Sequence, residues 1–430
     1  MRYWGITGTN GKTTCTWITA AFIDAQPSRR CGYVTTVEVW TGSRRFSTGY
    51  TTPPYAQLRE IFAEMEANGC TDCVMEVSSH AIHQHRTGDT VFAGGAFTNL
   101  TEDHLDYHKT MAAYFDVKLD FARQIAAAHP VRPDMGRREL PPYVVCLDGG
   151  CGREMYEAVG NLPVNVIPVR AGVDGVNRPA YDLDGLQLFG AYNRSNVLVA
   201  AALAEAAGVS HETIQAVIPT LRPRWGRLEY VPCASRAKVY VDFAHTPDGL
   251  EKVLSAVRDE MRPPASANPP SEQSAHSLWV VFGAGGDRDP MKRPLMGAAC
   301  ARLADRLVVT SDNPRSEDPM KIIEAIVAGV RQVRAIEQSP IEQSSTPQSS
   351  VPQSSVPQSS IPQSSIPRSN NLVVEPDRAK AIAYALAEAA AGDVVVIAGK
   401  GHETTQEIKG VKHPFDDREV VRTWQRSAGE

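Results

Sequence analysis

A glycine-rich turn near the start of the chain carries a lysine followed by two threonines. It reads Gly8-Thr9-Asn10-Gly11-Lys12-Thr13-Thr14 and stands between the apolar run 3–6 and the helix-compatible segment 15–23. Glycines let backbone N–H groups approach phosphate oxygens, and a helix N-terminus adds partial positive charge. The lysine would reach the terminal phosphates of a nucleotide, and the first threonine hydroxyl would ligate Mg²⁺. We expect a nucleoside triphosphate here, although Ile6 replaces the first glycine of the usual motif; the alternative is an ordinary turn before a helix.

Two polar clusters lie downstream of this turn. Glu76 ends an apolar run. A carboxylate at the carboxyl edge of a parallel sheet, beside a phosphate loop, is well placed to hold Mg²⁺. The stretch 99–108 packs two histidines and three acids after another apolar run. On residue type alone, this stretch is more typical of a solvated loop than of a metal site, and Lys118 is typical of an ordinary helical lysine.

The elements that must position these residues alternate along the chain. Strands are predicted at 71–75, 92–97, 143–147, 238–241, 278–282, 306–310 and 394–398. Helices are predicted at 57–67, 111–127, 195–207, 248–258, 319–333 and 377–390. Such alternation predicts an α/β protein with parallel sheets and crossover helices. The total is too long for one sheet, and the Pro-containing break at 221–224 is the best candidate for a domain boundary.

Composition bounds the class of protein. The chain has 430 residues, 42% of them hydrophobic, with a net charge of −5 and no dominant basic block, which argues against nucleic acid as a partner. No apolar run has the length of a membrane span, so we expect no membrane insertion. Because the chain runs straight into the phosphate loop, we expect no signal peptide and a cytoplasmic protein. Cys70 and Cys73 form a Cys-x-x-Cys without a second pair, and we expect buried free thiols.

One segment does not fit the α/β pattern. From about 336 to 371 the chain is dominated by a five-residue repeat of the form Val351-Pro-Gln-Ser-Ser. Proline at every fifth position opposes both a helix and a central strand, and the composition cannot build a core. We expect a disordered surface insertion, and a second, smaller one at 263–276.

The order of motifs resembles the Mur ligases of peptidoglycan synthesis, and among them the enzymes that add the third amino acid. The matching motifs are Gly8 to Thr14, Thr51-Thr52-Pro53, Glu76 to His80, Asn99 to His108, Asn193 to Asn196, Trp225 to Glu229, Val241 to Pro247, Phe282 to Asp289, Lys292 to Pro294, Asp312 to Arg315 and Gly399 to Glu403. The resemblance covers nearly the whole chain outside the two inserts.

This resemblance implies three domains, of which the chain would begin at the second. Residues 1–222 would form the central P-loop ATPase domain with a mainly parallel sheet, and residues 223–430 a C-terminal Rossmann-like α/β domain. The N-terminal UDP-binding domain would be missing. A truncated chain, a uridine held by another polypeptide and a loss of uridine recognition are the three explanations. A monomer is the expected state.

The resemblance also implies a reaction, in which ATP drives ligation of meso-diaminopimelate to the D-Glu carboxylate of UDP-MurNAc-L-Ala-D-Glu through an acyl phosphate. Lys12 would contact the β- and γ-phosphates. Thr13 and Glu76 would ligate a first Mg²⁺, and His104 would help to hold a second. Lys118, as a carbamate, would face a metal as an anionic oxygen ligand. The nucleotide would also be contacted by Asn193, Arg227, Asp242 and His245.

The remaining matched residues would hold the other two substrates. For the UDP-MurNAc-dipeptide they are Thr51, Thr52, Ser78, Gln84 and Arg86, together with Lys118. For diaminopimelate they are Arg293, Asp312, Asn313, Pro314, Arg315, Gly399 and Glu403. Arg315 would bind the distal carboxylate bidentately and Glu403 would pair the distal amine. Because a cation at position 315 would repel the ammonium of lysine, we expect diaminopimelate rather than lysine.

Three other functions are weighed against this one. A related ligase could add L-lysine. A folylpolyglutamate synthase-like enzyme is opposed by the motifs at Asp312 to Arg315 and Gly399 to Glu403. A truncated, non-catalytic nucleotide-binding module is supported only by the missing UDP-binding domain. The retention of charged positions such as Lys12, Glu76 and Lys118 opposes it.

Overall fold

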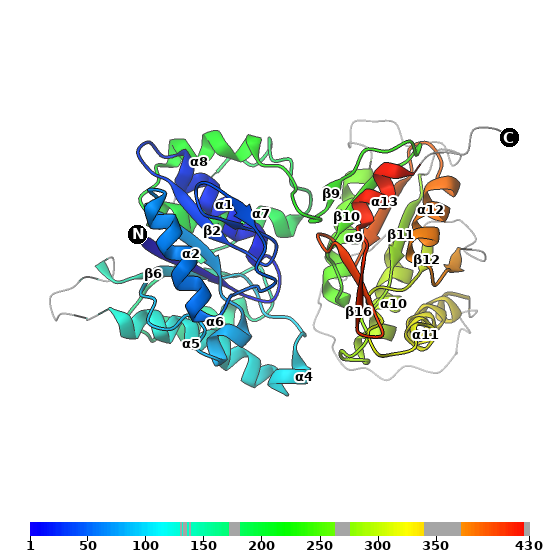
Figure 1. Cartoon of the computed structure of the whole chain (residues 1–430), viewed down its shortest axis with the longest axis horizontal. Coiled ribbons are helices and arrows are strands. Elements are labelled where there is room, and N and C mark those ends of the chain that lie inside the picture. The colour runs from blue at the N-terminus through cyan, green and yellow to red at the C-terminus, as the bar shows by residue number, and fades with distance from the viewer. Residues whose placement is uncertain are drawn as a thin grey trace, which may run out of the picture.

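The computed structural model describes residues 1–129, 131, 136, 139–171, 181–262, 276–338 and 371–424. Two lobes lie side by side, the first running from blue to green and the second from green to red in Figure 1. Each is a mostly parallel sheet with helices on both faces, so the predicted α/β fold class is confirmed. Within the described ranges, no helix is long and apolar enough to cross a membrane.

The first lobe is built on an eight-stranded sheet in the order β4-β3-β2-β5-β1-β6-β7-β8. Its strands are β1 (Arg2–Thr7), β2 (Cys31–Val34), β3 (Val39–Trp40), β4 (Arg45–Phe46), β5 (Asp72–Glu76), β6 (Phe92–Phe97), β7 (Pro142–Cys146) and β8 (Asn165–Val169). All pairs from β2 to β8 are parallel, and only the β2–β3 and β3–β4 pairs are antiparallel. The carboxyl ends of β1 and β5 are neighbours, with Ile6 opposite Glu76.

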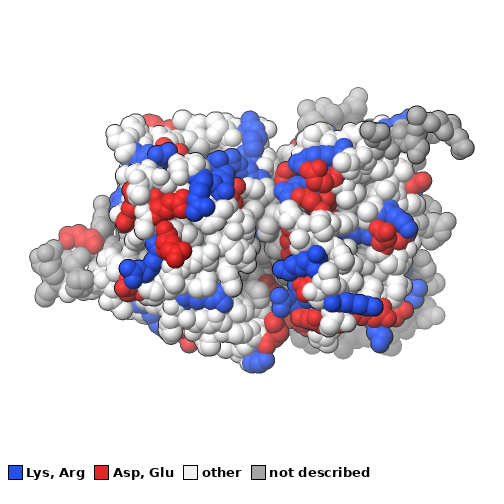
Figure 2. Space-filling model, in the orientation of Figure 1, with Lys and Arg blue, Asp and Glu red and all other residues white. Residues whose placement is uncertain are grey.

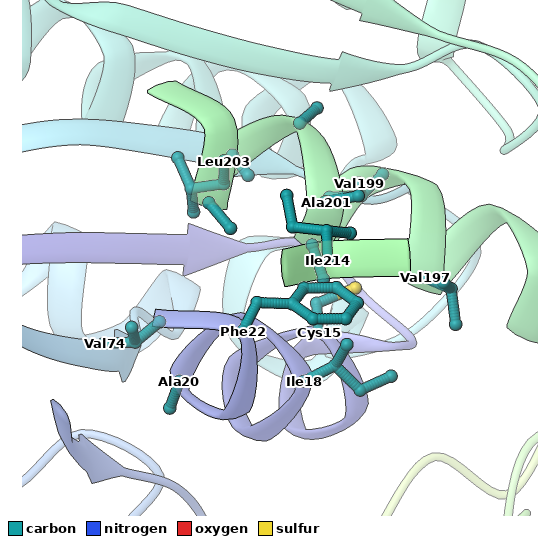
Figure 3. Close-up of a cluster of buried hydrophobic side chains, with 14 of the residues drawn as sticks. Cys15, Ile18, Ala20, Phe22, Val74, Val197, Val199, Ala201, Leu203 and Ile214 are labelled. Carbon is teal, nitrogen blue, oxygen red and sulfur yellow. The ribbon is translucent and has the colours of Figure 1, made fainter. Parts of the chain in front are cut away.

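Helices cover both faces of this sheet. They are α1 (Lys12–Ala25), α2 (Tyr55–Ala67), α3 (Ser79–His83), α4 (Leu105–His108), α5 (Met111–Ala128), α6 (Gly152–Gly160), α7 (Ala191–Ala206) and α8 (His211–Val217), followed by the 3-10 turn η2 (Ile218–Thr220). On one face α1, α7 and α8 bury Phe22, Leu203 and Ile214 against the sheet (Figure 3). On the other face α2 and α5 bury Phe62 and Phe121. This packing fixes the first turn of α1, and with it the phosphate loop.

The second lobe is built on a six-stranded sheet in the order β13-β12-β11-β14-β10-β9. Its strands are β9 (Glu229–Tyr230), β10 (Lys238–Asp242), β11 (Leu278–Phe282), β12 (Arg306–Val309), β13 (Leu372–Val374) and β14 (Val394–Ala398), and a separate hairpin is formed by β15 (Thr405–Ile408) and β16 (Val411–Pro414). Its helices are α9 (Pro247–Met261), α10 (Lys292–Leu303), α11 (Pro319–Gln338), α12 (Arg378–Glu388) and α13 (Asp417–Thr423). Helices α9, α10 and α11 cover one face, and α12 with α13 the other.

The predicted strands and helices are all present, most with ends shifted by a few residues. The strands predicted at 92–97, 278–282 and 394–398 match β6, β11 and β14. Cys70 and Cys73 are buried free thiols, as expected. The first sheet and its helices end before Leu221 and the second sheet begins at Glu229, so we keep 1–222 and 223–430 as the proposed domains. The predicted insertions at 336–371 and 263–276 lie outside the described residues, except at 276, 336–338 and 371.

A buried ion pair ties the carboxyl ends of two strands in the second lobe to its last helix. Arg378 donates to both carboxylate oxygens of Asp417, each at 2.7 Å, and neither side chain is exposed to solvent. The same guanidinium donates to Ser311 O at 3.4 Å and to Ala398 O at 3.0 Å. It therefore fixes the residues that directly precede Asp312 and Gly399.

Replacement of this arginine should be strongly destabilising. The substitution Arg378→Met leaves the Asp417 carboxylate buried without its cation, which costs about 3–5 kcal/mol of unfolding free energy. The measurement is guanidinium chloride denaturation followed by circular dichroism. The matched control is Arg422→Met, at a half-exposed arginine on α13, the helix that carries Asp417. It should change the unfolding free energy by less than about 0.5 kcal/mol. Equal effects of the two substitutions would contradict this assignment.

Candidate active site

The glycine-rich turn connects β1 to α1 at the carboxyl edge of the first sheet. Gly11 has a φ of 85° and is the residue before the helix. A Cβ atom there would stand 2.4 Å from the side-chain oxygen of Asn196, so only glycine fits both the dihedral angle and the space. The backbone N–H groups in the first turn of a helix have no partner within the helix, so this turn has the geometry that suits a phosphate.

Lys12 lies folded over this turn. Its Nζ donates to Gly8 O at 3.0 Å and to Thr9 O at 2.8 Å. Burial lowers the pKa of Lys12, while the nearby Glu76 carboxylate opposes that change. A bound anion would restore the favourable charge interaction that burial has weakened, which fits a phosphate ligand.

Glu76 and Thr13 form a pair of oxygen ligands beside the turn. The Thr13 hydroxyl donates to Glu76 Oε1 at 2.8 Å. The carboxylate also accepts from the Thr36 N–H at 2.8 Å and from its hydroxyl at 3.2 Å, and Glu76 is only 1% exposed. A buried carboxylate next to a hydroxyl, at the rim of a phosphate site, is a donor set that suits Mg²⁺.

Lys118 and His104 approach the turn from the other side. Lys118 is buried on α5, and its Nζ donates to Gly8 O at 2.8 Å. Burial lowers the pKa of Lys118 well below its ordinary value, and the neighbouring Lys12 lowers it further. His104, with a φ of 56°, lies at the start of α4, and burial lowers its pKa to about 4. His104 is therefore uncharged near neutral pH.

A pocket surrounds the phosphate loop and receives residues from both lobes. The lining residues include Thr9, Asn10, Gly11, Lys12, Thr13, Thr14, Thr51, Glu76, His104, Asn193, Arg227, Asp242 and His245. Every predicted nucleotide residue except Gly8 is among them. Arg227 Nη2 donates to Thr13 Oγ1 at 3.3 Å, and Asn10 Nδ2 donates to Asp248 Oδ2 at 3.0 Å, so the lobes meet at the phosphate loop. Figure 2 shows the groove between the lobes, with acidic and basic side chains on both margins.

In the second lobe, backbone N–H groups fix the position of the Asp242 side chain in this pocket. Asp242 ends β10 and accepts from the N–H groups of Leu228 at 2.6 Å and Ala244 at 2.7 Å. Burial raises its pKa to about 6 although Arg227 lies nearby. Burial also lowers the pKa of Arg227. The charged groups of Asp242 and Arg227 are thus shielded from solvent in this pocket.

A second pocket adjoins the first within the groove. Its lining residues are Glu102, Asp103, His104, Asp106, Phe243, His245, Pro247, Asp248, Gly285, Arg288, Asp289, Lys292, Leu295, Asp312, Asn313, Arg315, Gly399 and Glu403. Four residues, Asp103, His104, Phe243 and His245, line both pockets. Two ligands held in these pockets would therefore meet at those four residues.

Five of the seven residues predicted for the incoming amino acid line this second pocket. They are Asp312, Asn313, Arg315, Gly399 and Glu403. Arg315 has a φ of 50°, its N–H donates to Glu407 O at 3.0 Å, and its Nε lies 3.7 Å from Glu407 Oε2. Asn313 Nδ2 donates to Glu403 Oε2 at 2.8 Å. The two sequence-distant motifs thus form one wall.

The structure does not bring the other two residues to this wall. Arg293 is buried, and its two Nη atoms donate to Glu317 at 2.9 and 2.7 Å. Its Nε is buried without a hydrogen-bond partner within the described residues, and Arg288 and Lys292 line the pocket. Pro314 packs its carbonyl oxygen close to Gly286. Neither Arg293 nor Pro314 lines this pocket, and their contact with the amino acid stays a prediction.

The residues predicted for the UDP-MurNAc-dipeptide form a connected group beside the first pocket. Thr52 is fully buried, and its hydroxyl donates to Glu76 O at 2.9 Å and accepts from the Ser78 N–H at 3.0 Å. Arg86 Nε donates to Gln84 Oε1 at 2.9 Å, and its Nη1 to Thr52 O at 3.4 Å. Thr51 alone of these lines the first pocket. Thr52 therefore positions its neighbours, and Gln84 and Arg86 are the side chains open to a ligand.

Several lining residues were not predicted from the sequence. They include Thr36, Asp103, Asp106, Tyr192, Asn196, Phe243, Asp248, Lys252, Arg288 and Lys292. Most of them lie within or next to the matched motifs in the sequence. This proximity in sequence is the signal from which they could have been predicted. Thr36 has no such signal, because it belongs to the short turn after β2.

Two α/β lobes thus share a pocket at the glycine-rich turn and an adjoining charged pocket. The Mur ligase middle domain model matches residues 6–131, and the model for the Mur ligase glutamate ligase domain matches residues 226–401. The UDP-N-acetylmuramoyl-L-alanyl-D-glutamate--2,6-diaminopimelate ligase of Ralstonia nicotianae is 36% identical over 451 residues, covering 98% of this chain and 75% of that protein. The chain belongs to the Mur ligase family, and it is an ATP-dependent ligase.

Solved structures agree with this placement. A structure of a UDP-N-acetylmuramoyl-L-alanyl-D-glutamate--2,6-diaminopimelate ligase superposes with a TM-score of 0.56 at 29% identity, covering 98% of this chain and 77% of that one. The folylpolyglutamate synthase of Mycobacterium tuberculosis, solved with ADP and AMPPCP, has a TM-score of 0.55 at 17% identity, covering 93% of this chain and 88% of that one. The second likeness concerns the fold alone.

The buried histidines predict how stability depends on pH. Burial lowers the pKa of His108 to about 4 and that of His402 to about 3. The unfolded chain takes up these protons below about pH 6.5, whereas the folded chain does not, so stability falls as the pH is lowered. The melting temperature should therefore drop between pH 7 and pH 5, as measured by circular dichroism at constant ionic strength.

A pair of variants isolates the histidine contribution. His402→Gln should flatten the pH dependence, and His413→Gln, at an exposed residue of β16, should leave it unchanged. A melting temperature that stays constant or rises from pH 7 to pH 5 would contradict this account.

Proposed function

We propose that this ligase joins the amino group of meso-diaminopimelate to the D-Glu carboxylate of UDP-MurNAc-L-Ala-D-Glu, with cleavage of ATP to ADP and phosphate. The junction of the two pockets at Asp103, His104, Phe243 and His245 carries this proposal. A triphosphate in the first pocket and an amino acid in the second would both reach a carboxylate placed there. The names of the relatives at about 35% identity supply the identity of the substrates.

The reaction has two steps at one carboxyl group. A carboxylate oxygen of D-Glu attacks the γ-phosphorus, ADP leaves, and an acyl phosphate results. The neutral amine of diaminopimelate then attacks the acyl carbon, and the bond from that carbon to the bridging oxygen breaks, so that phosphate leaves with this oxygen. The proton of the amine passes to solvent or to a nearby base. Positioning and charge neutralisation are the protein's contributions. Lys12 and Arg227, from different lobes, are placed to neutralise the transferred phosphoryl group.

Mg²⁺ fits the oxygen-rich set formed by Thr13 and Glu76, with His104 and Lys118 on the other side of the turn. The ion would offset part of the triphosphate charge when it is bound. Lys118 would take part as a carbamate, since an unprotonated amine is the form that combines with CO₂. Its burial and lowered pKa support that modification.

The second pocket would hold the distal end of diaminopimelate. Arg315 would bind the distal carboxylate, and Asp312 and Glu403 would face the distal ammonium, with Asn313 and Gly399 completing the wall. Arg288 is the cation that we add in place of Arg293, because it lines this pocket. Lysine lacks the distal carboxylate and would leave the arginines unpaired. Gln84 and Arg86 would contact the dipeptide. We further propose a cytoplasmic monomer.

A panel experiment tests this function. The chain is incubated with ATP, Mg²⁺, UDP-MurNAc-L-Ala-D-Glu and one amino acid at a time, with and without a separately supplied UDP-binding domain from a relative. Phosphate release should be strongest with meso-diaminopimelate, and mass spectrometry should find the tripeptide product. Strongest release with L-lysine, or with no amino acid at all, would contradict the proposal.

Loss of the Lys118 side chain should abolish ligation. Lys118→Ala should lower kcat by at least about a hundredfold, because an anionic metal ligand is lost, and added formate or acetate should partly restore it. Lys321→Ala, at an exposed lysine of α11, is the matched control and should retain full activity. Full activity of Lys118→Ala would contradict the proposed role of a Lys118 carbamate.

A further inference from the structure

A lysine lies buried beneath the wall of the second pocket. Lys400, on the turn after β14, is 0% exposed and is not among the residues that line either pocket. Burial of an ammonium is costly unless its charge and its donors are satisfied. The groups that contact the Lys400 ammonium therefore indicate its role.

All partners of this ammonium belong to the pocket wall. Lys400 Nζ donates to Glu403 Oε2 at 3.0 Å and to Asn313 Oδ1 at 3.1 Å, and it lies 3.7 Å from Asp312 Oδ1. Asn313 Oδ1 also accepts from the Glu407 N–H at 3.0 Å. These bonds fix the orientation of the Asn313 amide, so that its Nδ2 points to Glu403. One cation thus organises three side chains from two strand ends.

One of these acids, Asp312, has a buried carboxylate oxygen that faces the lysine. Asp312 is 6% exposed and lines the pocket, and its Oδ1 has no hydrogen-bond partner within the described part of the chain. Lys400 is within ion-pair distance of this oxygen but too far to donate a hydrogen bond. The Lys400 ammonium therefore offsets the charge of this buried oxygen through space rather than through a hydrogen bond.

The charge of this cation affects which amino acid the wall accepts. Acidic side chains outnumber arginine and lysine among the residues that line the second pocket. Such a pocket by itself favours an amino acid whose distal end is a bare ammonium. A distal end that carries both an ammonium and a carboxylate has no net charge, so a buried cation disfavours it far less than it disfavours the bare ammonium.

We propose that Lys400 is a specificity-determining positioning residue, which sets the charge of the Asp312–Asn313–Glu403 wall so that a distal zwitterion is accepted in preference to a distal ammonium. This inference rests on the proposed function, because it concerns the amino-acid substrate of that reaction. Arg315 recognises the carboxylate directly, whereas Lys400 acts through the wall and touches neither substrate.

The test is a competition between meso-diaminopimelate and L-lysine, with the two ligation products quantified by mass spectrometry. Lys400→Met keeps the aliphatic stem and removes the charge. The preference for diaminopimelate should narrow by about tenfold to a hundredfold, because the wall becomes more negative. The KM for ATP should stay unchanged, since Lys400 does not line the nucleotide pocket. Lys380→Met, at an exposed lysine of α12, is the matched control and should keep the wild-type preference.

A second variant of opposite sign covers the case in which Lys400→Met does not fold. Glu403→Gln removes a negative charge from the same wall at a partly exposed side chain, and it should widen the preference for diaminopimelate. A product ratio that is unchanged in Lys400→Met, or narrowed in Glu403→Gln, would overturn the inference.

Failure of the inference is distinguishable from failure of the proposed function. A wild-type chain that forms neither product, with and without the supplied UDP-binding domain, overturns the proposed function and this inference with it. A wild-type chain that ligates diaminopimelate, with the same product ratio in Lys400→Met, overturns only the role of Lys400.

Discussion

Repulsion between a triphosphate and a carboxylate is the constraint on which this molecule depends. The two anions must come within bonding distance, and water cannot be the agent that screens them, because water would hydrolyse the activated product. Cations held by the protein must do so instead. Lys12 comes from the first lobe and Arg227 from the segment that leads into the second, and the two side chains lie in one pocket. Neither lobe alone supplies both.

The two parallel sheets make this arrangement possible. Parallel strands present their carboxyl ends at one edge. Glu76 and Asp242 are the last residues of β5 and β10, and His104 and Asp312 lie in segments that follow β6 and β12. Both edges face the groove between the lobes. Burial then shifts pKa values in directions that suit the chemistry: it lowers the pKa of Lys118 and His104, and it raises that of Asp242 to about 6. The ion pair between Arg378 and Asp417 holds the strand ends at which the second pocket is built.

Much of this structure could be predicted from the sequence, because buried parallel strands are continuous apolar runs. The run at 278–282 gives β11, and the glycine-rich turn gives the phosphate loop. Short edge strands such as β3 (Val39–Trp40) and the exposed hairpin strand β16 carry no such signal, since partners rather than composition define them. The motifs that line the two pockets were recognisable in the sequence, but not every lining side chain was. Arg293 lies on α10 and is paired with Glu317, whereas Arg288, five residues earlier, lines the pocket, and residue type does not distinguish the two arginines.

The central claim is that the nucleotide and the incoming amino acid occupy two adjoining pockets that meet at Asp103, His104, Phe243 and His245. A crystal structure with a non-hydrolysable ATP analogue, Mg²⁺ and meso-diaminopimelate tests it most directly. We predict that the γ-phosphate lies beside Lys12 and Arg227. The reacting amine should lie at the four shared residues, and the distal carboxylate should contact Arg315. A nucleotide bound away from the glycine-rich turn, or an amino acid whose reacting amine faces away from the shared residues, would contradict the account.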